Sequence, residues 1–385
     1  MHVVVCGAGY AGLTLTKRLE SSLPSDVDLT LVDESPDHLV QHELHRVIRR
    51  PGVANEIRLS LPGALERATV RVARVEAIDG DERVVSLSDG RLEYDIAAIC
   101  LGARTAYYGL EGVSEHGIPL KRLPHARRIR KRAREALRAD DGGRIVVGGA
   151  GLSGVQVAGE LAALAREEYG SASIALLEQR ARVAPGFPAD FGDAVARALE
   201  DSGIEIRTGT AVTGADADGV RLESGERVPF DLFVWTGGIR GADALEGERP
   251  TVKADLRLDD RTFALGDAAR VVDADREAVP ASAQAAVREA RTAAENIERL
   301  VEARRDGVET FDPDLESFRF ESPGWVVSVG DDAVATVGSR VLTGRAAKAL
   351  KASVGVGYLS DVGDAGSAGR FAYREFVPER FRRDR

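Results

Sequence analysis

Apolar positions divide the chain into two similar units. Each unit has a short continuous apolar run, a glycine cluster, apolar positions at helical spacing and a second apolar run that ends in an acidic residue. The units cover residues 2–33 and 144–178. Short continuous apolar runs bounded by turn residues are typical of buried strands, and the longer period is that of an amphipathic helix. The repeat therefore predicts two β-α-β units.

In the segments that follow each unit, apolar runs are shorter and turns are more closely spaced. Residues 68–101 alternate short apolar runs with turns, and residues 204–235 repeat this design, which is typical of β-meanders. A further strand at residues 263–265 precedes a long helix expected over about residues 281–304. This order predicts an α/β fold with two Rossmann-like dinucleotide-binding domains that carry β-meander insertions.

The last segment, residues 311–385, has a different pattern. It contains two strand candidates around residues 325–329 and 333–337, a helix candidate around residues 345–350, and a glycine-rich stretch that ends in aromatic residues and arginines. We expect a small C-terminal appendage here.

The first glycine motif, residues 7–12, has the form that a dinucleotide pyrophosphate requires. Gly7 permits the tight turn from strand to helix, Gly9 lets the backbone approach the phosphates, and Gly12 lets helix and strand pack closely. The N-terminus of the helix then faces the anion. Asp33 ends the following strand, where a carboxylate can accept hydrogen bonds from ribose hydroxyls. We therefore predict a dinucleotide site.

The second glycine motif repeats every part of the first, and its acid is Glu178. Two sites imply two dinucleotides. A carboxylate at this position repels a 2′-phosphate, so NADH is predicted over NADPH, although Arg180 and Arg182 keep NADPH possible. The predicted contacts of the second motif are Gly149, Gly151, Leu152, Ser153 and Gly154.

Composition sets broad limits. A chain of 385 residues suggests two or three domains, and 44% hydrophobic with 30% charged residues is typical of a soluble globular protein. The net charge of −10 argues against a nucleic-acid partner, so the very basic helix expected over residues 123–138 is interpreted as a solvated face. No basic segment and apolar core of a signal peptide precede the first strand, which predicts a cytoplasmic location.

The cysteine content offers little chemistry. Cys6 and Cys100 each end an apolar run far apart in the sequence, without CxxC or metal-ligand spacing. We predict two buried, inert thiols and no metal site.

Gly266 and Asp267 form a third piece of candidate chemistry. They follow the strand at residues 263–265 and precede the long helix, so a carboxylate is expected at the carboxyl end of a strand, where ligands bind in α/β sheets. Taken alone, Asp267 is equally a loop or helix-capping acid.

With its motifs in this order, the chain resembles the two-dinucleotide-fold flavoproteins, the family that includes the pyridine nucleotide-disulfide oxidoreductases. The resemblance covers residues 1 to about 300 and implies FAD at the first motif, NAD(P)H at the second, and the flavin's ribityl-phosphate region at Gly266 and Asp267. The strand at residues 94–103 looks like the family's strand that returns to the flavin, and residues 233–238 look like its counterpart. The resemblance implies FAD contacts at Gly7, Gly9, Tyr10, Ala11, Gly12, Asp33, Gly102, Gly266, Asp267 and Ala283, with Gly237 and Gly238 added to the NAD site.

Within this family, the chain is most similar to the type II NADH dehydrogenases, membrane-surface enzymes that reduce quinone without pumping protons. The similarity lies in residues 32–41, 118–121, 185–187 and 283–286. In that group an Ala-Gln-x-Ala-x-Gln segment lines the quinone site, which implies this role for Gln284. Arg288 stands where a second glutamine is expected, and Gln156 stands where many relatives have a glutamate. Glu160, one turn later, is either a substitute for that glutamate or an exposed helix acid.

The C-terminal helix candidate has a cationic side. Arg345, Lys348 and Lys351 are spaced to lie together, opposite Ala347 and Leu350, and further arginines follow at Arg380, Arg382, Arg383 and Arg385. This pattern favours weak, salt-sensitive contact with an anionic membrane surface, which we expect to be the inner face of the cell membrane. The alternatives are a helix that closes over the flavin domain and a homodimer interface.

Three hypotheses follow. The first is an NADH dehydrogenase that passes hydride from NADH to FAD and electrons on to quinone. The second keeps both cofactors but reduces a soluble protein such as a ferredoxin, docked on the basic helix, and the third is a non-catalytic dinucleotide sensor. The expected domains are residues 1–110 with 250–310 for FAD, residues 111–249 for NAD(P)H, and the C-terminal residues 311–385.

Overall fold

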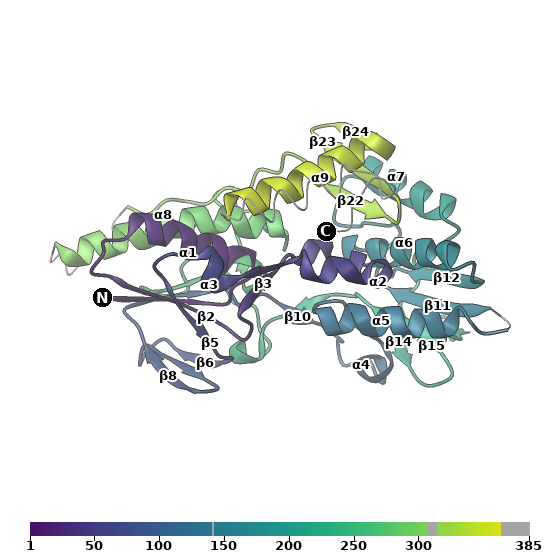
Figure 1. Cartoon of the computed structure of the whole chain (residues 1–385), viewed down its shortest axis with the longest axis horizontal. Helices are drawn as coiled ribbons and strands as arrows, with labels where there is room; N and C mark the ends of the chain where they lie inside the picture. Colours follow the sequence, from purple (N-terminus) through teal and green to yellow (C-terminus); the bar gives the residue numbers. More distant parts are fainter. Residues whose placement is uncertain (141, 307–313, 363–385) are drawn as a thin grey trace.

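A computed structural model describes residues 1–140, 142–306 and 314–362 of the chain. Two parallel sheets lie side by side, one in each of two lobes (Figure 1). In the first lobe the strands are ordered β20-β9-β1-β2-β5, and all pairings between them are parallel. These strands are β1 (His2–Cys6), β2 (Asp28–Asp33), β5 (Thr69–Val72), β9 (Ile96–Ile99) and β20 (Thr262–Ala264).

Alternating residues of β1 pack against different layers. Val3 and Val5 contact a cluster built with two helices, α1 (Tyr10–Ser22) and α8 (Ala283–Arg305). Val4 and Cys6 face the other side, where an antiparallel meander covers the sheet. Its strands are β6 (Val75–Asp79), β7 (Val84–Leu87) and β8 (Gly90–Glu93). Both faces are therefore buried, which explains the continuous apolar runs of the sequence.

The second lobe repeats this arrangement with the strand order β13-β12-β11-β17, again all parallel. Three helices share one buried cluster with the sheet, and a second meander covers the opposite face. The strands are β11 (Gly143–Gly148), β12 (Ala172–Leu177), β13 (Glu205–Arg207) and β17 (Leu232–Trp235). The helices are α5 (Leu123–Ala136), α6 (Leu152–Glu167) and α7 (Ala189–Asp201), and the meander is β14 (Val212–Ala215), β15 (Val220–Leu222) and β16 (Arg227–Val228).

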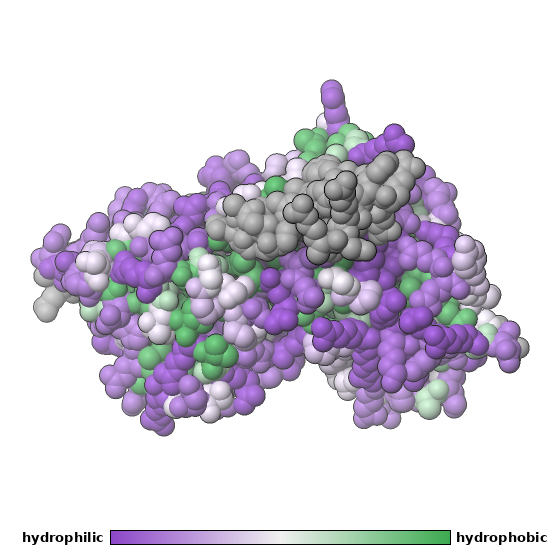
Figure 2. All heavy atoms as spheres, in the orientation of Figure 1, coloured by the Kyte–Doolittle hydropathy of each residue, from purple (hydrophilic) through white to green (hydrophobic). Residues whose placement is uncertain are grey.

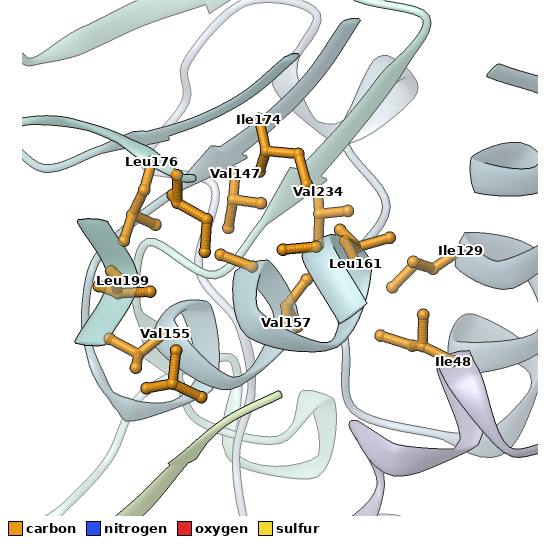
Figure 3. Packing of buried hydrophobic residues seen from close by; sticks show 14 of the residues in the cluster. Ile48, Ile129, Val147, Val155, Val157, Leu161, Ile174, Leu176, Leu199 and Val234 are labelled. Carbon is orange, nitrogen blue, oxygen red and sulfur yellow. The ribbon is translucent and has the colours of Figure 1, made fainter. Parts of the chain in front are cut away.

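The two lobes share hydrophobic packing. The short helix α2 (Arg46–Arg49) follows the first β-α-β unit in the sequence, yet its Ile48 packs beside Ile129 and Leu161 in the core of the second lobe (Figure 3). The chain crosses between lobes in two antiparallel strands, β10 (Arg104–Thr105) and β18 (Ile239–Arg240). The remaining short elements are β3 (Asp37–Leu39), β4 (Arg58–Ser60), α3 (Leu61–Ala64), α4 (Val113–His116), β19 (Thr251–Val252) and β21 (Arg270–Val271).

The C-terminal segment forms a small antiparallel sheet and a helix. The sheet packs on α6 and α7, and helix α9 (Gly344–Asp361) runs from it across both lobes towards α1 and α8 (Figure 1). Its strands are β22 (Val326–Val329), β23 (Asp332–Val337) and β24 (Arg340–Thr343). The two strands expected here are confirmed. The helix is three times longer than expected, because Gly355 and Gly357 obscure its apolar period in the sequence.

The cationic side predicted for this helix is only partly exposed. Arg345 and Lys348 face outward, but Lys351 points into the protein and its Nζ lies 3.4 Å from the buried Glu43 carboxylate. The expectation of three cations on one outer side is therefore wrong, because a buried acid distant in sequence pairs with Lys351. Arg380, Arg382, Arg383, Arg385 and the glycine-rich stretch lie outside the described residues.

The basic helix α5 is a solvated face only in part. The face drawn in Figure 2 is hydrophilic over α5, and Arg127 and Arg128 are exposed there. Arg130, however, donates hydrogen bonds to the carbonyls of Ile48 and Arg49, and Arg134 pairs with Glu168 at 2.7 Å. These inward cations attach α5 to its neighbours. Among the described residues, no helix is both long and apolar enough to cross a bilayer.

Glu160 is buried, which contradicts its interpretation as an exposed helix acid. Its carboxylate lies 2.9 Å from Arg49 Nε, and both side chains are at most 4% exposed. Arg49 also donates a hydrogen bond to Asp331 at the turn between β22 and β23. Burial raises the pKa of Glu160, and Arg49 opposes this effect. This ion pair therefore connects α2, α6 and the C-terminal sheet.

We predict that Arg49→Met lowers the free energy of unfolding by about 3–5 kcal/mol, because it leaves the Glu160 carboxylate buried without its partner. The double variant with Glu160→Leu should recover much of this loss. Urea denaturation of purified protein measures both effects. Arg71→Met, which removes an exposed pair with Asp89, is the control and should cost less than about 1 kcal/mol. Equal losses in the single and double variants would contradict this account.

Candidate functional site

The first glycine motif holds helix and strands in direct contact. A Cβ atom on Gly12 would lie 1.7 Å from the Gly7 carbonyl oxygen, and one on Gly7 would lie 2.4 Å from the Cys100 oxygen. Gly7 also has a φ of +102°, which side chains rarely adopt. A Cβ on Gly9, in contrast, would meet nothing within 4 Å. Gly7 and Gly12 are thus required for packing, whereas Gly9 faces open space at the helix N-terminus.

The second motif has the same geometry. A Cβ on Gly154 would lie 1.8 Å from the Gly149 oxygen, Gly149 has a φ of +96°, and a Cβ on Gly151 would meet nothing within 4 Å. Leu152 and Ser153 begin helix α6. Gly237 lies beside this turn, because a Cβ on Gly149 would be 3.0 Å from its Cα. Gly238 lies against the Tyr108 hydroxyl instead.

The two acidic residues occupy equivalent positions. Asp33 accepts hydrogen bonds from the backbone N–H groups of Ala8 (2.6 Å) and Ser35 (2.9 Å). Glu178 accepts from Ala150 (2.8 Å) and Arg180 (2.9 Å). Burial raises the pKa of Asp33, and these N–H donors counteract part of that rise. Each carboxylate is therefore held at the carboxyl end of a strand, beside its own glycine turn.

A cleft of about 730 Å³ opens at the first motif. Gly7, Gly9, Asp33 and Gly102 line it, together with five cationic side chains from both lobes, Arg58, Arg74, Arg104, Lys121 and Arg122, and four further acidic ones, Glu34, Asp37, Glu76 and Asp243. The four arginines form ion pairs with Asp37, Glu76 and Glu34. Cofactor pockets in proteins typically occupy about 300–1,000 Å³. The open space at Gly9 and the helix N-terminus fit the pyrophosphate of a dinucleotide, and Lys121 adds a positive charge to the lining.

Gly266 and Asp267 lie next to this motif, in the turn that precedes helix α8. A Cβ on Gly266 would be 3.1 Å from the Ala11 side chain and 3.5 Å from that of Ala286, so α1, α8 and the turn meet here. Burial lowers the pKa of Lys121, and Asp267 partly offsets this effect across the cleft. The Gly-Asp pair and the first glycine motif, more than 250 residues apart, are thus adjacent in the fold.

Helix α8 begins at Ala283, with its N-terminus capped by the Ser282 hydroxyl, which accepts a hydrogen bond from the Ala285 N–H at 3.1 Å. Gln284 is partly exposed, and its amide lies 3.5 Å from the Ser322 hydroxyl. Arg288, one turn further, is also partly exposed. The first turns of α8 therefore lie beside Gly266. Glu160 belongs to neither glycine motif.

Glu289 lies at the site but was not predicted from the sequence, although it follows Arg288 directly. Its buried carboxylate accepts a hydrogen bond of 2.6 Å from the Gly266 N–H. Burial raises its pKa to about 7, because the charged form loses hydration and Asp267 adds repulsion, while the Gly266 N–H and Arg249 act in the opposite direction. An acid on a helix face gives no sequence signal for this contact.

A cluster of histidines beside the first motif was also missed. Three of the six histidines of the chain, His38, His42 and His45, lie within eight residues of each other, and this density was the available signal. His38 Nδ1 lies 2.7 Å from the Ala8 oxygen, and His42 Nδ1 lies 2.5 Å from the Tyr10 hydroxyl. The segment after the first acid thus contacts the glycine motif itself.

The two cysteines are buried and free, as predicted. They lie on adjacent strands, but Cys6 packs into the meander side of the sheet and Cys100 into the helix side. Burial raises the pKa of the Cys6 thiol to about 12. The two side chains therefore cannot form a redox-active disulfide. Among the described residues, no three His, Cys, Asp or Glu side chains gather to hold a metal ion.

Two glycine-turn sites in parallel sheets, one opening into a cofactor-sized cleft, define a two-dinucleotide oxidoreductase fold. The model for the pyridine nucleotide-disulphide oxidoreductase family matches residues 1–290, and the chain belongs to this family. The α/β fold and the family predicted from the sequence are confirmed.

One relative of the chain and two solved structures are similar to it over most of its length. The type II NADH:quinone oxidoreductase of Staphylococcus aureus (strain NCTC 8325 / PS 47) is 26% identical over 398 residues, which cover 95% of this chain and 97% of the relative. The structure of NDH2 from Plasmodium falciparum in complex with NADH matches with a TM-score of 0.84 and 14% identity, covering 99% and 98% of the two chains. A ferredoxin reductase from Rhodopseudomonas palustris matches with a TM-score of 0.72 and 20% identity over 88% and 82%. These two structures establish likeness of fold.

We predict that Gly9→Ala weakens binding of a dinucleotide at the first motif at least tenfold without lowering the melting temperature, because its new methyl group meets only the space that the ligand needs. Gly12→Ala is the matched comparison and should destabilise the protein itself, since its methyl group overlaps the Gly7 carbonyl. Equilibrium dialysis and thermal denaturation separate the two effects. Unchanged affinity in a folded Gly9→Ala protein would contradict the assignment.

A second prediction concerns Glu289. Its pKa is higher in the folded protein, about 7, than its ordinary value of 4.5, so the folded state binds the proton more tightly. The resulting stability is fully present below about pH 4.5 and is lost as pH rises to about 7. Glu289→Gln keeps an acceptor for the Gly266 N–H and should flatten the decline of unfolding free energy between pH 5 and pH 7. Glu295→Gln, on the exposed side of α8, should retain the wild-type slope.

Proposed function

We propose that this protein is an FAD-dependent NADH dehydrogenase that passes electrons to a quinone without pumping protons. The observation that carries the proposal is the presence of two complete dinucleotide cradles in one chain, one of which opens into a cleft of cofactor size. The similarity to a type II NADH:quinone oxidoreductase over 95% of the chain supports the choice of acceptor.

In this proposal each cradle binds one cofactor. The first lobe, residues 1–110 and 250–310, binds FAD through the first motif, Asp33, Gly102 and the Gly266–Asp267 turn. The second lobe, residues 111–249, binds NADH through the second motif, and residues 311–385 form the C-terminal region. Bound FAD supplies the redox chemistry, in which it takes hydride from NADH and returns two electrons to the acceptor.

The protein's own contribution is binding and orientation. The N-terminus of α1 and Lys121 in the lining of the cleft hold the anionic part of FAD, while Asp33 is placed to meet ribose hydroxyls. The equivalent placement of Glu178 disfavours a 2′-phosphate, which supports NADH over NADPH. Gln284 and Arg288, on the first turns of α8 beside Gly266, are the residues that we assign to the quinone.

A second candidate acceptor is a soluble redox protein, favoured by the exposed cations of α5. The inward contacts of Arg130 and Arg134 reduce this patch, whereas Arg127, Arg128, Lys131 and Arg132 are exposed. We also propose weak membrane contact through the C-terminal region, where Arg345 and Lys348 face outward, and a homodimer as the alternative use of that surface.

The decisive experiment is a steady-state assay of the purified flavoprotein with NADH or NADPH and with soluble menaquinone analogues, ubiquinone analogues or ferricyanide. We expect quinone reduction with NADH, at a kcat/KM at least tenfold higher than with NADPH. Gln284→Ala should raise the KM for quinone and leave ferricyanide reduction unchanged. Arg127→Glu with Arg128→Glu is the matched test of the second candidate and should leave quinone reduction intact. A flavin that NADH bleaches but no quinone reoxidises would overturn the proposal.

A further inference from the structure

Three side chains form a chain of contacts that starts at the first cradle. Tyr10 is the first residue of α1, and its Oη lies 2.5 Å from His42 Nδ1. His42 Nε2 lies 3.5 Å from a carboxylate oxygen of Glu43. In this arrangement the imidazole can pass a proton to the O–H group, because the carboxylate fixes the orientation of the ring and stabilises its charged form.

The chain connects the cradle with solvent. The inner end is Tyr10, which is adjacent to Gly9, interacts electrostatically with Asp267 and packs its ring 4.8 Å from that of Tyr358 on α9. The outer end is the His42 ring, whose side chain is 28% exposed, whereas that of Glu43 is 1% exposed. Glu43 is thus shielded from water, whereas the His42 and Tyr10 side chains are both partly exposed.

Glu43 is a permanent anion in this setting. Burial alone would raise its pKa, but Lys351, His42 and Arg46 together lower that pKa far below the usual range. Arg46 donates a hydrogen bond of 2.9 Å to it, and Lys351 reaches it from α9. Glu43 therefore orients the His42 ring and stabilises its protonated form, but it does not itself release a proton.

We propose that Tyr10 delivers the solvent proton that quinone reduction consumes, and that His42, oriented by Glu43, replaces it. The inference rests on the proposed function, in which NADH + H⁺ + quinone gives NAD⁺ + quinol. The hydride supplies two electrons and one of the two protons of the quinol. The other proton must come from solvent, and Tyr10 is the one titratable side chain within the two glycine motifs.

The relay returns to its starting state after each proton that it delivers. In the resting state the Tyr10 hydroxyl donates to neutral His42 Nδ1. Protonation of the imidazole from solvent reverses this bond, so that Nδ1–H donates to Oη and the phenolic hydrogen is free to turn towards the acceptor. The Tyr10 O–H bond then breaks as an O–H bond of the quinol forms, and the Nδ1 proton restores the phenol. His42 is left neutral and takes its next proton from water.

The charged groups around His42 determine its pKa and therefore the pH dependence of quinone reduction. Burial lowers the pKa of His42, Glu43 raises it, and the cations Lys351 and Arg46 lower it further. Its other titratable neighbours are His38 on β3 and His45 beside α2, and His38 is in turn hydrogen-bonded to Tyr358 on α9. The protonated fraction of His42 therefore grows as pH falls below 6.5, and we expect the rate of quinone reduction to rise in the same range.

The test compares two acceptors in Tyr10→Phe holoenzyme. Quinone reduction consumes a proton, whereas reduction of ferricyanide takes electrons alone. We expect the variant, saturated with FAD, to lose about 100-fold or more in quinone turnover, in line with the usual contribution of general acids, and to lose far less with ferricyanide. Tyr94→Phe, which removes a buried hydroxyl elsewhere in the first lobe, should change neither rate. Equal losses with both acceptors, or no loss with quinone, would overturn the relay.

His42→Ala provides an independent variant if Tyr10→Phe does not fold. The partly exposed position of the ring allows added imidazole to enter the space, and we expect it to restore quinone turnover in this variant but not in Tyr10→Phe. In ¹⁵N-histidine-labelled holoenzyme, the His42 signals should titrate below 6.5, and Glu43→Gln should lower that midpoint further. Absence of rescue, or a midpoint unchanged by Glu43→Gln, contradicts the relay. Wild-type protein that fails to reduce quinone would instead refute the proposed function itself.

Discussion

Contact between the first turn of a helix and the strand before it is the constraint on which both candidate sites depend. At Gly12 and Gly154 the helix backbone lies so near the preceding turn that even a methyl group would overlap a carbonyl oxygen. This contact aims the N-terminus of each helix at the space in front of Gly9 and Gly151, and it sets the carboxyl end of each second strand beside that space. The acids Asp33 and Glu178 then occupy the same position relative to their turns. Each accepts a hydrogen bond from the backbone N–H of the second residue of its glycine motif. One local packing rule, applied twice, thus produces two sites of the same shape.

The parts of the fold that the sequence predicted are those with local causes. Glycine motifs, strand ends and the period of α1, α5, α6 and α8 all depend on residues within about twenty positions of each other, and these elements lie where the sequence indicated. The parts that it missed depend on partners distant in sequence. Glu160 seemed a surface acid because Arg49 lies more than 100 residues away, and Lys351 seemed a surface cation because Glu43 lies more than 300 residues away. A charge in a helical pattern indicates a solvent-facing position unless its buried partner is known.

The buried ion pairs also explain why the two lobes and the C-terminal segment form one body. Helix α2 belongs to the first lobe by sequence, yet Ile48 lies in the core of the second, and Arg49 connects it to α6 and to the C-terminal sheet. Helix α9 then spans both lobes through Lys351 and Tyr358 and ends in a pair between Asp361 and Arg291 on α8. Apolar packing alone would allow these elements to slide, whereas charges inside the protein require a single arrangement, because every displaced ion would remain desolvated without its partner.

The discontinuity of the first lobe determines the order in which the chain can be completed during synthesis. Strand β20 and helix α8 belong to the sheet and helix layer of the first lobe but emerge from the ribosome only after the entire second lobe. The second lobe completes its core later still, because Val327, Val329 and Val334 of the C-terminal sheet belong to its buried cluster. Until α8 arrives, one face of β1 and α1 stays uncovered, so the N-terminal strands need protection by other proteins or by transient burial. Cofactor loading at the first cradle is consequently a late event, possible only when translation is nearly finished.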